Sequence, residues 1–299
     1  MSLWLSACGG SGNAPNTAAQ TPQTAMVANT LSTLSCTPNE QLTGPNGSTL
    51  INNTWNSTAA GSNAWSQCLQ SRTLPVNGSG STVQHGWRWN WPDTAAAVFA
   101  YPELVVGINP WGAGPGNDAR FPALISGLRT LNIQFAAETS TAGSHNLAVS
   151  MWLIQTPLVA RDPQSSDIKG EVMVWTDYTD DMVVDPGTTT KRGEFTDANG
   201  LVFDVWADEN WGDASKGASN PWVYVAYHLK PNQRRLAAKI DLKAILRHAA
   251  SLKDSRNRSL PLINTDWHVA DVELGNEIVS GHGETWLTDF AVTMALALP

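Results

Sequence analysis

The stretch that decides the fold reads Gly170-Glu171-Val172-Met173-Val174-Trp175. In an extended chain, successive side chains point to opposite faces, so Val172 and Val174 share one face and Glu171, Met173 and Trp175 share the other. The valine face suits a hydrophobic core. A carboxylate beside two large apolar side chains is unusual for a plain solvent surface. The segment therefore predicts a strand with one core face and one functional face.

A second stretch, Asp271-Val272-Glu273-Leu274-Gly275-Asn276-Glu277-Ile278, has the same character. Its alternation points Val272, Leu274 and Ile278 inward and places Glu273, Gly275 and Glu277 on the opposite face. The absence of a side chain at Gly275 predicts room for a ligand to approach the backbone. Two strands that are far apart in the sequence would thus each present carboxylates.

Most of the remaining chain also reads as strands separated by turns. Apolar and β-branched runs such as Leu147–Leu153 and Trp222–His228 alternate with turn clusters such as Asn199-Gly200. Only Asp241–Leu252 has a helical pattern, with Ile240, Ile245, Ala249 and Leu252 on one face and Asp241 as the cap. One helix among many strands predicts an all-β sandwich or barrel.

Composition restricts the function. The 299 residues carry a formal net charge of -8, which argues against the basic stripe that a nucleic-acid binder needs. No apolar run reaches the roughly 18 to 20 residues of a membrane-spanning helix. Charged residues make up only 15%, while tryptophan is plentiful with 14 copies. We expect a soluble, acidic, tryptophan-rich protein.

The amino terminus predicts export and lipidation. Leu5-Ser6-Ala7-Cys8 resembles a bacterial lipobox, in which Cys8 would be acylated, although a chance match of four residues is the alternative. The following segment is rich in Gly, Ala, Asn, Thr and Pro and lacks apolar periodicity, as a tether would. We therefore expect residues 1–8 to be a residual signal or lipobox segment, 9–33 a flexible tether and 34–299 a catalytic domain. The expected location is secreted, or a periplasmic or cell-surface lipoprotein of a bacterium, with membrane attachment through Cys8.

The other two cysteines, Cys36 and Cys68, are 32 residues apart and have no metal-binding spacing. For an exported protein a disulfide is favoured over two free buried thiols. The six histidines also lack metal-ligand spacing. The acidic stretch Asp177–Asp181 has the composition of a calcium loop, but a solvated loop is the commoner explanation. We predict no metal and no cofactor.

A third cluster, Trp87-Arg88-Trp89-Asn90-Trp91, would place three indoles on one face of a strand. Indole rings stack on the flat C–H faces of sugars, and Asn, Asp and Glu bond sugar hydroxyls. The alternative is that these tryptophans are the packed side of a sandwich. Together with the carboxylates, the cluster favours carbohydrate binding.

From Cys36 to Met294 the chain resembles glycoside hydrolase family 12, the β-jelly-roll endoglucanases and xyloglucanases. The resemblance rests on the order and spacing of short motifs over roughly 260 residues. They are Asn52-Asn53-Thr54-Trp55, Trp89-Asn90-Trp91, Val98-Phe99-Ala100-Tyr101-Pro102-Glu103, Gly170–Trp175, Val272–Glu277 and Asp289-Phe290-Ala291-Val292.

This resemblance implies a β-jelly-roll sandwich of two antiparallel sheets, with a concave substrate cleft and one short helix. It also implies a retaining endo-acting hydrolase of β-1,4-glucans (cellulose, mixed-linkage glucan or xyloglucan) that acts as a monomer without a cofactor. Glu171 would be the nucleophile and Glu277 the general acid/base, with Glu273 as a rival acid. Such enzymes need two carboxyl groups about 5 to 5.5 Å apart.

The resemblance also implies substrate-binding roles. Trp55 would stack on sugar rings, Asn53 would bond a hydroxyl, and Met173 and Trp175 would lie beside the nucleophile. Trp89 would contact sugar or, as the equal alternative, support the sheet. One departure is Ser150, which stands where family members usually carry an Asp beside the nucleophile. We expect this loss of a titrating group to simplify the acidic limb of the pH–rate profile.

The sequence leaves two other classes of function possible. A non-catalytic carbohydrate-binding β-sandwich lipoprotein would keep the indoles but would not need the pair Glu171 and Glu277. A surface lipoprotein with an interaction role would depend only on Cys8 and the tether.

Overall fold

The computed structural model describes residues 29–76, 80–93, 97–111, 116–155, 167–182, 189–211, 221–255 and 257–297. Cys8 and the lipobox lie outside these residues, as does the tether up to residue 28. The first strand, β1, begins at Thr30, so residues 30–33 of the predicted tether are part of a sheet. The folded domain therefore begins a few residues earlier than the sequence indicated.

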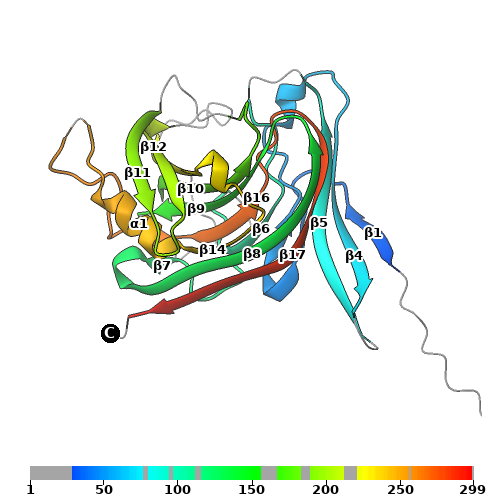
Figure 1. The fold of residues 1–299 in the computed structure, drawn as a ribbon, viewed down its shortest axis with the longest axis horizontal. Helices are drawn as coiled ribbons and strands as arrows, with labels where there is room; N and C mark the ends of the chain where they lie inside the picture. Colours follow the sequence, from blue (N-terminus) through cyan, green and yellow to red (C-terminus); the bar gives the residue numbers. More distant parts are fainter. Residues whose placement is uncertain are drawn as a thin grey trace, which may run out of the picture.

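One layer is a six-stranded sheet in which every neighbouring pair is antiparallel. Its strands, in spatial order, are β1 (Thr30–Ser35), β4 (Ser66–Pro75), β5 (Ser81–Trp91), β17 (Gly281–Leu296), β8 (Leu128–Ala142) and β14 (Ala237–Asp241). The long strands β8 and β17 run side by side and curve together across the molecule (Figure 1).

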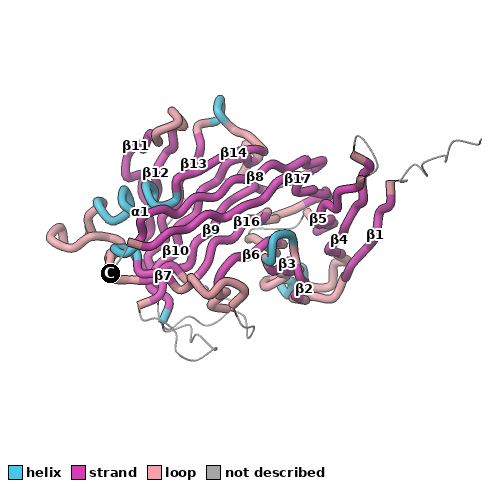
Figure 2. Tube along the Cα trace, turned by 90° about the horizontal axis from the view of Figure 1, so that it is seen from below, coloured by secondary structure: helices cyan, strands magenta, loops and turns pink. Residues whose placement is uncertain are grey.

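The second layer is an eleven-stranded sheet (Figure 2). Its main path is β11 (Thr190–Thr196), β12 (Val202–Trp211), β13 (Trp222–Leu229), β10 (Ile168–Tyr178), β9 (Asn146–Ile154), β16 (Asp271–Gly275), β6 (Glu103–Gly107), β3 (Thr49–Ile51) and β2 (Gln41–Thr43). The short strands β15 (His268–Val269) and β7 (Ala123–Leu124) pair at its side.

One pair in this second sheet departs from the predicted antiparallel arrangement. Strands β10 and β13 run parallel, with Glu171 opposite Tyr224. The chain enters the β11–β12–β13 meander at the far edge of the sheet, so β13 returns beside β10 in the same direction. The two-layer all-β architecture itself agrees with the prediction.

The hydrophobic core lies between the two sheets. Val172 and Val174 of β10 are fully buried in it, as their alternation predicted, and meet residues such as Ile133 and Phe290 from the other sheet. Burying apolar surface at roughly 25 cal/mol per Å² makes this interior the main stabilising contribution. Because the core takes one face of β10, the other face, with Glu171, is turned away from it.

The helix that the sequence predicted is α1 (Leu242–Ser251), which directly follows β14. The side chain of Asp241 caps its first turn by accepting the Ala244 N–H at 3.0 Å. Ile245, Leu246 and Ala249 are buried against the main core. The described 3₁₀ turns are Pro45–Gly47, Ser57–Ala60, Ile125–Gly127 and Pro231–Gln233.

Cys36 and Cys68, the pair for which the sequence favoured a disulfide, are joined by an S–S bond of 2.00 Å. The bond ties the segment after β1 to β4. Among the helices of the described ranges, none has the length and apolar character to cross a membrane.

Candidate active site

Three neighbouring strands of the eleven-stranded sheet bring the predicted residues together. Strand β9 lies between β10 and β16, with Ser150 opposite both Met173 and Glu273, and Trp152 opposite Glu171 (Figures 1 and 2). We call the side of the sheet that carries these residues the carboxylate face. It is turned away from the core, because the alternating residues of the same strands fill the core.

Glu171 is nearly buried on this face, with 9% of its surface exposed. The Ser150 hydroxyl lies 3.4 Å from its Oε1 and donates to it. Burial raises the pKa of Glu171 well above its usual value, and the charges of Glu277 and Glu273 raise it further. Trp222 and Ser150 oppose this rise because they stabilise the charged form.

Glu277 is held by Asn146, a residue that the sequence analysis did not single out. The Nδ2 of Asn146 donates to the Glu277 carboxylate, and its Oδ1 accepts the Glu277 N–H at 2.9 Å. The Asn146 N–H also donates to the Glu277 carbonyl at 3.0 Å. The sequence alone could have indicated Asn146, because every second residue of a strand lies on the same face, and Asn146 is four residues before Ser150.

The protonation states of Glu171 and Glu277 are linked. Burial raises the pKa of Glu277 to about 7, against the donation from Asn146, which lowers it. Because a charge on Glu277 raises the pKa of Glu171, the second ionisation is harder than the first. The two carboxyl groups therefore share one proton over a range of pH, as a site that needs one acid and one carboxylate requires.

Glu273, the rival acid, lies near enough to Glu171 for its charge to raise the pKa of that group. It belongs to a buried carboxyl trio that also contains Glu103 of β6 and Asp271 of β16, all at most 2% exposed. Side-chain hydrogen bonds join Glu273 to both of the others. The sequence analysis quoted Glu103 and Asp271 in its motifs but gave them no role.

Apolar groups surround Glu171. Met173 and Trp175 lie on the carboxylate face as predicted, yet they are 2% and 3% exposed. Trp175 stacks on His228 with ring centroids 3.9 Å apart, and the Tyr224 hydroxyl lies 3.4 Å from the Met173 sulfur. Burial lowers the pKa of His228 to about 3, so this imidazole is neutral. These residues form an apolar support for the carboxylate rather than an open sugar platform.

A cluster of three tryptophans lies next to Glu171 and was missed by the sequence analysis. Trp152 packs edge-on against Trp111 and Trp222, with centroids 5.2 and 5.6 Å apart. Trp111 and Trp152 are half-buried, whereas Trp222 is buried.

Asn53 and Trp55 follow β3 and are both half-buried. The Asn53 amide donates to Glu103 Oε1 at 2.9 Å, and its Oδ1 accepts the Trp55 N–H at 3.2 Å. Asn53 is thus engaged with protein groups. These bonds connect the Trp55 turn to Glu103 of the carboxyl trio.

Two expectations need correction. Trp89 is 3% exposed and belongs to the core between the sheets, together with Trp87 and Trp91, so it supports the sheet and does not face sugar. Gly275 leaves no room for a ligand. A Cβ at this position would lie 2.5 Å from the Pro102 carbonyl oxygen and 3.0 Å from the Tyr101 ring, because the neighbouring chain fills that space.

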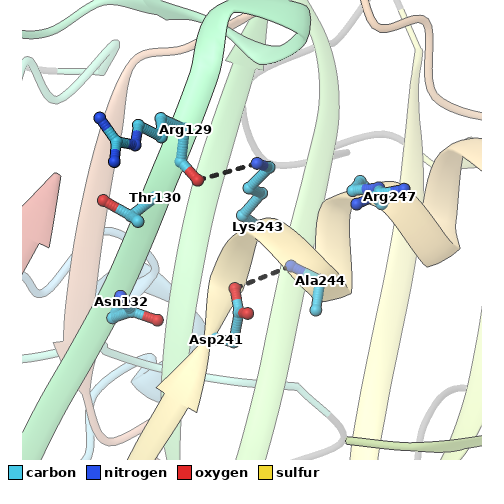
Figure 3. A pocket seen from close by; sticks show the side chains of 7 residues that line it. All are labelled: Arg129, Thr130, Asn132, Asp241, Lys243, Ala244 and Arg247. Carbon is cyan, nitrogen blue, oxygen red and sulfur yellow. Dashed lines mark hydrogen bonds between the residues drawn. The ribbon is translucent and has the colours of Figure 1, made fainter. Parts of the chain in front are cut away.

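A surface pocket lies elsewhere (Figure 3). It is lined by residues of β8 and of the start of α1, among them Arg129, Asn132, Lys243 and Arg247. Lys243 donates to the Arg129 carbonyl at 2.8 Å. Since Leu131 and Ile133 of β8 point into the core, the pocket is on the outer side of the six-stranded sheet, opposite the carboxylate face. It plays no part in the carboxylate site.

No cluster of three or more His, Cys, Asp or Glu side chains with metal-binding geometry occurs among the described residues. The segment Asp177–Asp181 is described, and Asp180 pairs there with Arg234. The carboxyl trio is a hydrogen-bonded group rather than a set of open ligands.

Comparison with known proteins finds similar chains among endoglucanases and xyloglucanases. No family model matches the chain. Endoglucanase S of Pectobacterium parmentieri is 24% identical over 249 residues, which is 83% of this chain and 82% of that protein.

Solved structures show the same fold. The native family 12 xyloglucanase from Bacillus licheniformis superposes with a TM-score of 0.67 at 22% identity, covering 90% of this chain and all of that one. Endoglucanase cel12A from Rhodothermus marinus gives a TM-score of 0.61 at 19% identity, with 91% and 100% coverage. The chain has the β-jelly-roll fold of these family 12 enzymes, as the motif resemblance predicted.

Proposed function

We propose that this chain, which has the fold of glycoside hydrolase family 12, is an endo-acting β-1,4-glucan hydrolase of that family that retains anomeric configuration. The observation that carries the proposal is the pair Glu171 and Glu277. Burial raises the pKa of both carboxyl groups, and the charge of Glu277 raises that of Glu171 further. The similarity to endoglucanase S supports the choice of a glucan as substrate.

In this mechanism Glu171 attacks the anomeric carbon, while Glu277 donates its proton to the leaving glycosidic oxygen. The glycosidic bond breaks and a covalent bond forms between sugar and Glu171. Glu277, now a carboxylate, takes a proton from water, and the resulting hydroxide equivalent releases the sugar with retained configuration. Both protons are accounted for, and each carboxyl group returns to its first state.

The shared proton must lie on Glu277 when the reaction begins. In the ligand-free structure, burial and the charge of Glu277 both raise the pKa of Glu171. Positive charge that develops at the anomeric carbon beside Glu171 stabilises its carboxylate, and the proton is then retained by Glu277. Substrate binding thus leaves Glu277 protonated as the acid and Glu171 ionised as the nucleophile.

Substrate recognition would depend on the half-buried tryptophans of the carboxylate face. Trp55 is proposed to stack on glucosyl rings and is held by Asn53 and, through it, by Glu103. Cellulose, mixed-linkage glucan and xyloglucan are all candidate polymers. We also propose that the enzyme acts as a monomer outside the cytoplasm, attached to a membrane through acylated Cys8.

The decisive experiment compares the wild type with Glu171→Gln. Release of reducing sugar from xyloglucan, carboxymethyl cellulose and mixed-linkage β-glucan would be measured, together with binding of the same polymers. Activity that collapses in the variant while binding survives supports the hydrolase, and the best polymer identifies the substrate. No release by the wild type, with binding retained, would instead support the non-catalytic carbohydrate-binding sandwich.

A further inference from the structure

Two turns of the chain have the same construction. In Asn53-Thr54-Trp55 and in Asn109-Pro110-Trp111, the asparagine Oδ1 accepts the N–H of the tryptophan two residues later, at 3.2 and 2.8 Å. Each asparagine also donates its amide to a buried carboxylate. The Asn-x-Trp turn therefore occurs twice, and each time it fixes the backbone of a half-buried tryptophan.

The asparagines of the two Asn-x-Trp turns hydrogen-bond to neighbouring members of the carboxyl trio. Asn53 donates to Glu103 at 2.9 Å, and Asn109 donates to Glu273 at 3.3 Å. A side-chain hydrogen bond joins Glu103 to Glu273. A continuous path of hydrogen bonds thus runs from Trp55 through the trio to Trp111.

The third member of the trio closes a ring of contacts. Asp271 hydrogen-bonds to Glu273 and accepts the Trp152 N–H at 3.1 Å. The Trp152 indole packs edge-on against Trp111 at 5.2 Å. Trp111 is therefore held from two sides, by its own turn and by Trp152.

Two members of the trio, Glu103 and Asp271, hold protons. Glu103 Oε2 and Asp271 Oδ2 are buried and find no donor, which is the arrangement expected when each carries a proton and donates it to Glu273. Burial raises the pKa of both groups well above the usual range, and that of Glu273 to about 7. Among the described residues, no ion pair includes a member of the trio. The other titratable groups that face it are Tyr101, Glu171 and Glu277.

We propose that the carboxyl trio is the common anchor of both Asn-x-Trp turns, and that Trp111, held in the same way as Trp55, is a second stacking platform for the glucan. In this arrangement Glu103, Asp271 and Glu273 are positioning residues. They do not touch the substrate, and they act through Asn53, Asn109 and Trp152. The inference rests on the proposed glucan hydrolase and adds to it a residue that binds sugar.

The test measures binding of cellohexaose by calorimetry in a Glu171→Gln background, so that the ligand is not consumed. Trp111→Ala and Trp55→Ala should each raise the dissociation constant at least about fivefold, as truncation of a buried aromatic anchor does. Binding by Trp111→Ala that equals the parent would overturn the platform.

Asn109→Asp tests the anchor separately, and its fold stays close to the parent because the replacement has the same shape. The neighbouring carboxyl group of Glu273 should raise the pKa of the new Asp above its usual value of about 3.9, so at pH 4 it regains a proton that it can donate to Glu273, and affinity should approach that of the parent. At pH 8 two carboxylates face each other, and affinity should fall about fivefold or more. Equal affinity at both pH values, or an equal loss at both, would refute anchoring through Glu273.

Asn117→Asp is the matched control in the same segment. Asn117 bonds Gly107 N, Val105 O and Thr49 Oγ1 and has no contact with the trio. Its variant should bind cellohexaose like the parent at both pH values. If the parent binds no glucan at all, the proposed function fails first. If the parent binds and the wild type hydrolyses glucan while both test variants behave like the parent, only the present inference fails.

Discussion

Asn146 holds Glu277 at three points, through its N–H, its Oδ1 and its Nδ2, although 131 residues separate the two in the sequence. Asn146 is fully buried, and Asn276 Nδ2 donates to its carbonyl at 2.5 Å. The proposed acid is thus fixed in both backbone and side chain before any substrate arrives, which is how a proton donor is kept in productive geometry.

Asn146→Ala should lower kcat by about 10- to 100-fold, because the proton donor loses its orientation. It should also raise the pKa of Glu277 above about 7, since the lost donation stabilised the carboxylate. The basic limb of the pH–rate profile would then move to higher pH. Asn132→Ala, on the outer side of the other sheet, is the control, and an unshifted basic limb in Asn146→Ala would contradict the assignment.

Glu277→Gln should lower the pKa of Glu171, because the charge that raises it is removed. With an aryl cellobioside whose leaving group needs no proton, the variant retains the first step. The acidic limb of its pH–rate profile should therefore lie at lower pH than in the wild type. A limb that stays in place would show that the two carboxyl groups are not coupled.

Ser150 donates a hydrogen bond to Glu171, the proposed nucleophile. Ser150→Ala removes a donor that stabilises charged Glu171, so the pKa of Glu171 should rise and the acidic limb should move to higher pH. Ser150→Asp adds a titrating group, and its acidic limb should show a second ionisation. An unchanged profile in Ser150→Asp would mean that the serine does not simplify the titration.

Gly275→Ala should destabilise the fold by about 1–3 kcal/mol, the usual cost of overpacking, because its Cβ would clash with Pro102 O and Tyr101. Urea denaturation measures the free energy of unfolding. Gly127→Ala is a matched control, since the nearest atom to its Cβ would be 3.7 Å away in Leu124. Equal stability of both variants would refute the steric argument.

Replacing Cys36 and Cys68 together by Ser should lower the free energy of unfolding by roughly 3 to 4 kcal/mol, from the loop of 32 residues that the bond closes. The folded variant should keep its kcat, because the bond lies outside the carboxylate face. The free energy of unfolding is measured by urea denaturation, and activity is assayed at urea concentrations below the transition. A loss of kcat in the folded variant would contradict the expectation that the disulfide affects stability alone.

Much of this arrangement could be read from the sequence because alternation fixes which side chains share a face. Gly170–Trp175 and Asp271–Ile278 revealed two strands with carboxylates opposite a core face, and Asp241 with its apolar stripe revealed α1. The order of motifs was enough to indicate the jelly roll. The strand and helix signals are local and depend on backbone periodicity and side-chain type, whereas the jelly roll came from the resemblance of the motif order to a known family.

Tertiary structure alone decided which strands are neighbours and which face each strand turns to the core. Alternation placed three indoles on one face of β5 but could not say that this face, with Trp89, is the buried one. It could not bring Asn146 to Glu277, or Glu103 to Glu273 and the two Asn-x-Trp turns, because those contacts join distant segments. The sequence by itself determined the strands and the carboxylates that they carry. Packing of the two sheets decided the partners and the protonation of these carboxylates, since burial and neighbouring charge exist only in the folded chain.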